Sequence, residues 1–228
     1  MQLTLYSHPL SLFAAKVRIA LAAKGLVYQL VDVQLDRIRG YEPKHPEVVR
    51  HNPKRQVPVL IADELVLYDS TLILEFLEDI APEPPLYPRD ARQRARCRLL
   101  ELEADEVFFP PLSSLLQLVY AQASGGSDDA ATRARSADAI VAHYARLAGQ
   151  LGSAEFLCGD LSVADIAHFL VASYAQSLGV PIPAQLTMLG AWFGRIAARP
   201  VVAAEILSMQ EAAREFRAPR VADSVVTS

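Results

Sequence analysis

Four prolines fall within eight residues in the segment APEPPLYP, residues 81–88. Proline lacks a backbone N–H and has a fixed φ, so this segment can form neither a helix interior nor a central strand. Before it, strand-like apolar runs alternate with helical patterns, whereas the residues after it are rich in Ala, Leu and Arg and carry no strand signal. The sequence therefore predicts an α/β domain at residues 1–81 and an all-α helical domain at 89–217, joined by a stiff linker.

The first domain is predicted to alternate strands and helices. Strands are expected at 2–6, 27–33, 57–61 and 65–68, and helices at 11–24 and 70–80. The strand–helix–strand unit indicates a parallel crossover, and the short turn between the last two strands indicates a hairpin. The helices expected in the second domain are 89–122, kinked at Pro110 and Pro111, then 130–151, 162–178, 184–198 and 201–214.

Composition and charge narrow the class of protein. A net charge of −4 gives no reason to expect a nucleic-acid partner. The five arginines of residues 89–98 are interpreted as a solvated helix face, balanced by four acidic residues at 101–106. Cys97 and Cys158 stand in unrelated contexts with no metal-ligand spacing, so we expect a reducing compartment and no metal. Without a signal peptide or a membrane span, we expect a soluble cytoplasmic protein.

Ser11 is the first candidate functional residue. It stands in SHPLSLFAAKVRIAL, residues 7–21, after a short strand and before a helix that has no charge until Lys16. Serine is a good helix N-cap. A helix N-terminus also offers free N–H groups and a partial positive charge, which favour an anion. Ser11 is therefore either only a cap or a group that also takes part in chemistry.

Two later segments also admit a structural and a functional interpretation. In QVPVL, residues 56–60, Pro58 either begins an edge strand or follows a cis peptide bond that turns the backbone of Val57 outward. In DSTLILEF, residues 69–76, Ser70 is an N-cap candidate and Asp69 stands beside it. Either these two residues hold the carboxylate and the ammonium of an amino acid, or they are a cap and a surface carboxylate.

Together these segments resemble the glutathione S-transferase family over nearly the whole chain. LYSHPLS, HNPKRQVPVL and LYDSTLILEFLED occur in the family's order and at its spacing, and LCGDLSVADIAHF, residues 157–169, is similar to the family's signature helix start. The resemblance implies a thioredoxin-like first domain with a cis peptide bond before Pro58. Ser162 and Asp165 form a predicted capping box, which stabilises the fold and takes no part in catalysis.

The resemblance also implies how glutathione, the expected co-substrate, would bind. Val57 would pair its backbone with the cysteinyl unit, as an added strand does. Asp69 and Ser70 would hold the γ-glutamyl end, and Gln56 and Lys44 the glycine end. The implied glutathione-binding residues are Val57, Pro58, Asp69, Ser70, Gln56 and Lys44.

For catalysis, Ser11 stands at the serine position of bacterial theta-like and zeta-like members. Zeta-like patterns follow this serine with Ser-Cys and an Arg, whereas Leu12, Phe13 and Ala14 follow it here. This difference argues against maleylacetoacetate isomerisation. The residues expected to line an apolar acceptor pocket are Leu10, Leu12, Phe13, Phe108, Phe109 and Tyr120.

Two functional hypotheses follow. The chain is a detoxifying enzyme that transfers glutathione to small hydrophobic electrophiles, or the same fold binds glutathione or docks a partner without turnover. The intact set of Ser11, Pro58, Asp69 and Ser70 favours the enzyme. The family also implies a symmetric homodimer, in which Asp105 either reaches the neighbour's glutathione amine or is a solvated surface carboxylate.

Overall fold

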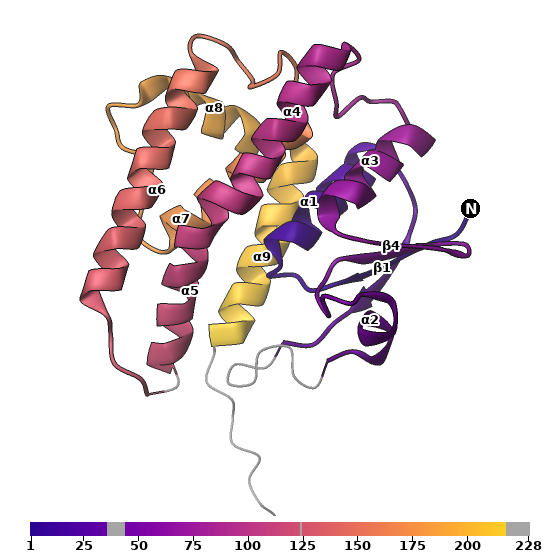
Figure 1. Cartoon of the computed structure of the whole chain (residues 1–228), viewed down its shortest axis with the longest axis horizontal. Helices are drawn as coiled ribbons and strands as arrows, with labels where there is room; N and C mark the ends of the chain where they lie inside the picture. Colours follow the sequence, from indigo (N-terminus) through magenta and orange to yellow (C-terminus); the bar gives the residue numbers. More distant parts are fainter. Residues whose placement is uncertain (36–43, 124, 218–228) are drawn as a thin grey trace, which may run out of the picture.

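The computed structural model describes residues 1–35, 44–123 and 125–217 (Figure 1). The sheet of the first domain has the order β2-β1-β3-β4, formed by β1 (Leu3–Ser7), β2 (Gln29–Asp32), β3 (Val59–Ala62) and β4 (Leu65–Tyr68). β1 pairs with β2 in parallel and with β3 in antiparallel orientation, and β3 and β4 form the predicted hairpin. This sheet with its helices, followed by a helical region, confirms the predicted fold class, a thioredoxin-like α/β domain and an all-α domain.

Helices cover both faces of the sheet. They are α1 (Leu12–Ala23), α2 (Pro46–His51) and α3 (Ser70–Ile80). α1 and α3 pack side by side on one face, and α2 lies on the other (Figure 1). Because side chains alternate along a strand, Leu5 of β1 joins the main core beneath α1 and α3. Its neighbour Tyr6 packs on the opposite face with Val48 of α2 and Val59 of β3.

The second domain is helical in its described part. Its elements are α4 (Ala91–Glu103), η1 (Ala104–Phe108), α5 (Phe109–Ala123), α6 (Ala130–Leu151), α7 (Val163–Ser177), α8 (Thr187–Ala197) and α9 (Pro200–Arg217). The single helix predicted at 89–122 is interrupted by η1, a π-helical turn that ends two residues before Pro110. Proline has no backbone N–H to donate to the preceding turn, so the hydrogen-bond pattern of the helix changes there. No helix in the described ranges is long and apolar enough to cross a membrane.

α7 is the central helix of this domain, and the predicted capping box stabilises its start. Ser162 is the N-cap, and its backbone N–H donates to Asp165 Oδ2 at 3.0 Å. The other oxygen of this buried carboxylate accepts from the indole N–H of Trp192 at 2.8 Å and from the backbone N–H of Leu157 at 2.9 Å. Asp165 therefore joins α7, α8 and the loop before α7, which fits the structural role expected for this motif.

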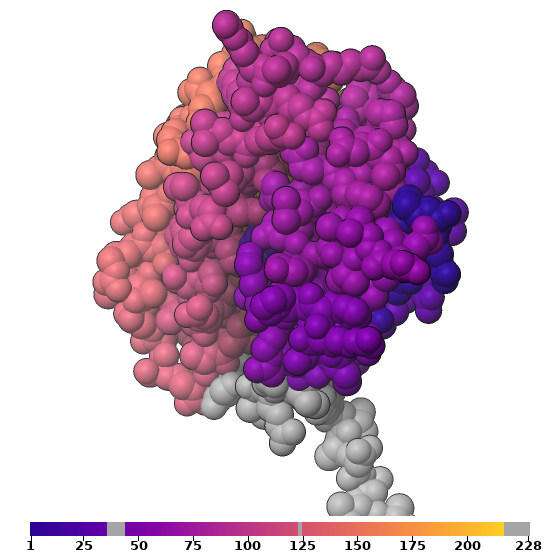
Figure 2. Space-filling view, turned by 45° about the vertical axis from the view of Figure 1, so that its right-hand side comes forward, coloured from indigo at the N-terminus to yellow at the C-terminus, as the bar shows by residue number. Residues whose placement is uncertain are grey.

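The linker lies against the first domain. Residues 81–90, all of them described, form no helix or strand. Lys24, buried at the end of α1, donates to Glu78 Oε2 at 2.7 Å and to the carbonyls of Ala81 at 2.6 Å and Pro84 at 3.0 Å. Apolar side chains from both sides of the linker form one continuous core, and Figure 2 shows the first domain, in purple, directly against the helices that follow, in pink. The linker thus marks a change of architecture within one packed body.

The arginine-rich segment has other partners than expected. Arg94 and Arg98 both bind Glu75 of α3, at 3.3 Å and 2.6 Å. Glu101 and Asp105 bind Lys16, and Glu103 binds Arg146, so among the described contacts these acidic residues do not balance the arginines of 89–98 as predicted.

Candidate functional site

Ser11 lies where β1 leads into α1 and is the N-cap of that helix, as predicted. Its Oγ accepts the backbone N–H of Ala14 at 3.2 Å, and its own N–H donates to the carbonyl of His8 at 3.0 Å. A hydroxyl has two acceptor positions and one hydrogen. Among the described contacts the Ser11 hydroxyl only accepts, so its hydrogen is free to donate to a bound group.

The loop before Ser11 is tied to both domains. Arg18 lies further along α1. Its guanidinium donates to the carbonyls of His8 at 3.1 Å and Pro9 at 3.0 Å. Tyr174 of α7 donates its hydroxyl to the carbonyl of Leu10 at 2.8 Å. Burial lowers the pKa of His8, with the nearby Arg18 adding to this effect and Asp32 opposing it. These contacts hold the backbone that positions Ser11. Neither Arg18 nor Tyr174 was found from the sequence, because their acceptors are backbone carbonyls, which every residue has and which therefore leave no sequence signal.

The sequence left open whether Pro58 begins an edge strand or follows a cis peptide bond, and the structure has the cis bond. The Val57–Pro58 peptide bond is cis, and Val57 lies two residues before the first paired residue of β3. Buried Asn52 braces the preceding loop: its amide donates to the carbonyl of Gln56 at 2.7 Å, and its Oδ1 accepts the N–H of Lys54 at 2.8 Å. The Gln56 side chain is exposed. Sequence reasoning missed Asn52, although it stands within the HNPKRQVP segment that carries the resemblance.

The N-terminus of α3 differs from the prediction by one residue. The N-cap is Asp69, whose Oδ1 accepts the N–H of Thr71 at 3.1 Å, so Ser70 is the first helical residue and not the cap. Asp69 has a φ of 82° and a ψ of 122°, a conformation that is uncommon for residues other than glycine. Its Oδ2 lies 3.0 Å from Lys54 Nζ, and this contact raises the pKa of Lys54. The Asp69 carboxylate therefore already holds an ammonium group, of the kind a γ-glutamyl unit presents.

A buried ion cluster lies one turn beyond Ser11. Lys16 Nζ is 2.5 Å from Glu101 Oε1 and 2.7 Å from Asp105 Oδ2, and Thr71 donates its hydroxyl to Glu101 at 2.8 Å. Burial raises the pKa of Asp105 to about 6, against the opposing effect of Lys16. Asp105 is thus a largely buried partner of its own chain's Lys16 and not the solvated surface carboxylate of the sequence interpretation. The cluster connects α1, α3, α4 and η1 beside the site.

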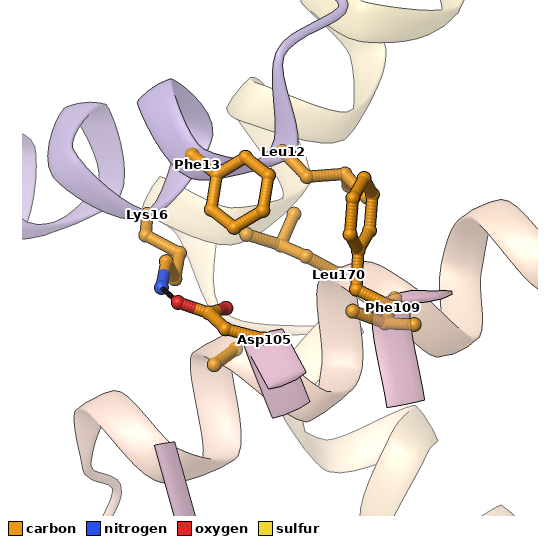
Figure 3. A pocket seen from close by; sticks show the side chains of 8 residues that line it. Leu12, Phe13, Lys16, Asp105, Phe109 and Leu170 are labelled. Carbon is orange, nitrogen blue, oxygen red and sulfur yellow. Dashed lines mark hydrogen bonds and ion pairs between the residues drawn. The ribbon is translucent and has the colours of Figure 1, made fainter. Parts of the chain in front are cut away.

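Figure 3 shows the crevice next to this cluster, where Phe13 and Phe109 face each other. Their rings meet edge to face with centroids 4.8 Å apart. The crevice has no room for a water molecule. Leu12, Phe13 and Phe109 therefore line a closed seam between the domains, and in this arrangement they pack against one another instead of facing an open pocket.

An open pocket of about 450 Å³ lies on the other side of Leu10, between α5, α7 and α9. Two of the residues predicted to line an acceptor pocket, Leu10 and Tyr120, border it. Phe108 does not, because it is fully buried in the core with its ring stacked on His143 at 4.1 Å. Lining residues include Leu10, Leu116, Tyr120, Tyr174, Met209 and Arg214. The surface is mostly apolar, and Arg214 is the one charged side chain among its described lining residues.

The described residues hold no group of three or more His, Cys, Asp or Glu side chains that could bind a metal ion. Lys44, predicted at the glycine end of glutathione, is half-buried just before α2. The structure thus places Ser11, the cis peptide bond and the N-terminus of α3 at the same end of the sheet, after β1, before β3 and after β4, with the open pocket beyond Leu10.

Comparisons with known proteins agree with this architecture. Residues 10–80 match the family model of the glutathione S-transferase N-terminal domain, and residues 106–200 match that of the C-terminal domain. The chain therefore belongs to the glutathione S-transferase family. A crystal structure of a glutathione S-transferase from Rhodospirillum rubrum F11 is similar with a TM-score of 0.78 at 27% identity, covering 90% of this chain and 91% of that one.

Two relatives in this family are named for different functions. A probable maleylacetoacetate isomerase of Vibrio cholerae is 39% identical over 130 residues, which make up 57% of this chain and 59% of that protein. A stringent starvation protein A homologue of Coxiella burnetii is 36% identical over 109 residues, or 47% of this chain and 48% of that protein. The chain spans about half the length of these relatives. Family membership by itself therefore does not select one activity.

Proposed function

We propose that this chain is a glutathione S-transferase that joins the sulfur of glutathione to small hydrophobic electrophiles, with Ser11 as the catalytic residue. The observation that carries the proposal is the position of Ser11. Its hydroxyl caps α1 with its hydrogen free to donate, and the residue before it, Leu10, lines the 450 Å³ apolar pocket. A thiolate at Ser11 and an apolar electrophile in the pocket would thus be neighbours.

Glutathione would bind along the edge formed by the Val57–Pro58 turn and the start of α3. The outward backbone of Val57 would pair with the cysteinyl unit. Asp69 would accept the γ-glutamyl ammonium, and the free N–H groups of α3 at Ser70 would hold its carboxylate. Gln56 and Lys44 would contact the glycine end.

The reaction would proceed through the thiolate. A free thiol has a pKa of about 8.5, so only a small fraction is ionised at neutral pH. A hydrogen bond from the Ser11 hydroxyl and the partial positive charge at the start of α1 both stabilise the sulfur anion and lower its pKa. The thiol proton leaves to water, the sulfur forms a bond to the electrophilic carbon, and a leaving group such as halide departs with its electron pair. Ser11 remains protonated throughout, because it acts as a donor and not as a base.

We also propose that the chain forms a symmetric homodimer. The supporting observation is a set of exposed leucines on α3 and α4, namely Leu72, Leu99 and Leu102, which are 57%, 56% and 51% exposed. Large apolar side chains grouped on one surface are typical of a protein interface. The family implies such an assembly, and a two-fold axis would bring the same patch of each copy together.

A second candidate function is binding without turnover. The observation that favours it is the ion pair between Lys54 and Asp69, because a γ-glutamyl ammonium would have to compete with an ammonium of the same chain. A stringent starvation protein A homologue among the relatives is consistent with roles other than conjugation in this family. In this alternative the same surfaces dock glutathione or a partner protein.

One experiment separates the two functions. The full chain is passed over immobilised glutathione, eluted with free glutathione, and then assayed for conjugation with a panel of aryl halides, activated alkenes and epoxides. Retention with turnover of at least one electrophile supports the transferase. Retention without turnover across the panel favours the binding protein. Failure to bind glutathione overturns the transferase and the glutathione-binding form of the alternative.

A further inference from the structure

The lining of the open pocket between α5, α7 and α9 changes in character along α9. It runs from Ile206 and Met209 to Gln210 and then to Arg214, at the three- and four-residue spacing that keeps side chains on one face of a helix. The apolar residues come first and the polar ones last. A volume of about 450 Å³ fits a small organic molecule. Along α9 the pocket therefore has an apolar body and one charged end.

The apolar part of this lining begins beside the loop that leads to Ser11. Nη2 of Arg18 donates to the carbonyl of Pro9 at 3.0 Å and to Glu205 Oε1 at 2.5 Å. Because one nitrogen atom contacts both groups, the loop lies level with the Glu205 turn of α9. The next residue of α9, Ile206, lines the pocket. The apolar body of the pocket therefore starts next to the place proposed for the thiolate.

Arg214 lies at the opposite end. It is nine residues beyond Glu205, which is a rise of about 14 Å along an α-helix. Its side chain is exposed at the pocket, and among the described contacts its guanidinium has no hydrogen-bond or ion-pair partner. The neighbouring acids Glu211 and Glu215 are not among the described lining residues, whereas the Gln210 amide lies one turn before Arg214 on the same face. This end can therefore accept an anion.

The separation of the two ends matters because glutathione reacts as an anion. A negative charge next to the sulfur would destabilise the thiolate. At about 14 Å the two charges are further apart than the screening length of about 8 Å at physiological ionic strength, so their repulsion is weak. A cation at the far end attracts a carboxylate and keeps it away from the sulfur. The arrangement favours an acceptor with its reactive carbon at one end and its carboxylate at the other.

We propose that the acceptor is an amphipathic organic acid, with its electrophilic carbon beside Ser11, its apolar body along Ile206 and Met209, and its carboxylate on Arg214. This inference rests on the proposed transferase function and adds the class of electrophile to it. The sulfur–carbon bond forms and the leaving group departs with its electron pair as before, and the carboxylate is unchanged. Arg214 is a specificity residue remote from the reacting atoms, so it acts on KM and not on kcat.

Two aryl chlorides that differ in a single charge test the proposal. They are 6-(4-chloro-3-nitrobenzamido)hexanoic acid and its methyl ester, whose reactive rings are the same because the amide separates the ring from the tail. With the full chain and glutathione, KM should be about fivefold lower for the acid, the scale of an exposed ion pair. The preference should shrink in about 1 M salt, which screens exposed charges. Equal KM values for acid and ester at low salt overturn the proposal.

Matched variants assign the preference to Arg214. Arg214→Gln should raise KM of the acid about fivefold with kcat unchanged, and Arg214→Lys, which keeps the charge, should retain most of the preference. The control is Arg135→Gln, which removes the same charge from an exposed position of α6 outside the pocket lining and should behave as the wild type. A preference that persists in Arg214→Gln, or that is lost in Arg135→Gln, overturns the assignment.

A binding measurement separates this inference from the transferase itself. The probe is 6-(3-nitrobenzamido)hexanoic acid, which has no leaving group, and it is titrated by calorimetry into the protein without glutathione. Tighter binding of this acid than of its methyl ester, lost in Arg214→Gln, supports the acid site even where no electrophile is turned over, a result that overturns the transferase alone. Turnover of neutral electrophiles with no preference for the acid, in rates or in calorimetry, supports the transferase and overturns the acid site.

Discussion

Arg18 of α1 and Glu205 of α9 form a buried ion pair that joins the first and the last of the described helices, with Nη2 and Oε1 2.5 Å apart. The same guanidinium donates to the Ser7 hydroxyl and to the carbonyls of His8 and Pro9. Glu205 also accepts from Arg18 Nε at 3.0 Å. The packing of the last helix is therefore connected through one side chain to the loop that positions Ser11.

Removing this connection should affect both stability and activity. Arg18→Met leaves the Glu205 carboxylate buried without its partner, which costs about 3–5 kcal/mol when a buried pair is broken from one side. The variant should lower the free energy of unfolding in urea and reduce kcat/KM. Arg133→Met, which breaks the more exposed pair with Asp128, is the control and should change stability by less than about 1 kcal/mol. Equal effects of the two substitutions would contradict the role given to Arg18.

Ser11→Ala tests whether the hydroxyl is a cap alone. Loss of a cap costs about 1 kcal/mol of stability and leaves the chemistry unchanged. Loss of a thiolate donor should reduce kcat/KM by at least about tenfold while glutathione still binds, and the pKa of the bound thiol, followed by thiolate absorbance, should rise. Ser162→Ala, at the N-cap of α7, is the matched control for the capping effect. Wild-type values of both rate and thiol pKa in Ser11→Ala would show that another group holds the thiolate.

Asp69→Asn should weaken glutathione binding. Asparagine still accepts the Thr71 N–H as an N-cap, but it lacks the charge that would hold the γ-glutamyl ammonium. The expected loss is about 1–3 kcal/mol, the usual magnitude for a charge-assisted hydrogen bond, measured by calorimetry. The control is Asp63→Asn at the β3–β4 turn, where the aspartate also has a positive φ and accepts the Gln2 N–H. A folded Asp69→Asn protein with unchanged affinity would refute this binding mode.

The buried histidines His143 and His168 predict the acid stability of the fold. Their ring nitrogens are 3.3 Å apart, and burial lowers the pKa of His143 to about 4 and of His168 to about 3. In the unfolded chain each has a pKa of about 6.5. Because the unfolded state binds the extra protons, their contribution to stability is present above pH 6.5 and is lost as the pH falls toward 4.

The free energy of unfolding should therefore fall between pH 7 and pH 5, by about 1–2 kcal/mol for each histidine. In His143→Gln the fall should be shallower by one histidine's share. Urea unfolding at the two pH values measures the free energy of unfolding of both proteins. Parallel curves for the variant and the wild type would mean that the buried pair does not govern the acid response.

The exposed leucines of α3 and α4 predict the oligomeric state. Light scattering at micromolar concentration should give the mass of a dimer for the wild type. Leu99→Glu should yield monomers, since a charge at an apolar interface must be desolvated. Leu207→Glu on α9, where the side chain is 60% exposed, should remain dimeric. A monomeric wild type would rule out the dimer.

Local signals along the chain predicted most of the architecture. The prolines of residues 81–88 mark the change from the α/β part to the helices, the periodicities place the elements within a few residues, and the caps at Ser11 and Ser162 follow from short-range hydrogen bonding. The same signals failed by one residue at α3, where Asp69 and Ser70 are both good caps and the helix begins at Ser70 with Asp69 as its cap.

The sequence by itself therefore determined the features that depend on neighbours a few residues away. These are the helices, the hairpin, the capping box and the family pattern. The tertiary structure decided which of two adjacent phenylalanines is buried, why Asp105 faces Lys16, and how Arg18 reaches the carbonyls beside Ser11. These contacts join residues far apart in the chain. They depend on how the helices rotate and pack against one another, and no local pattern of residues specifies that packing.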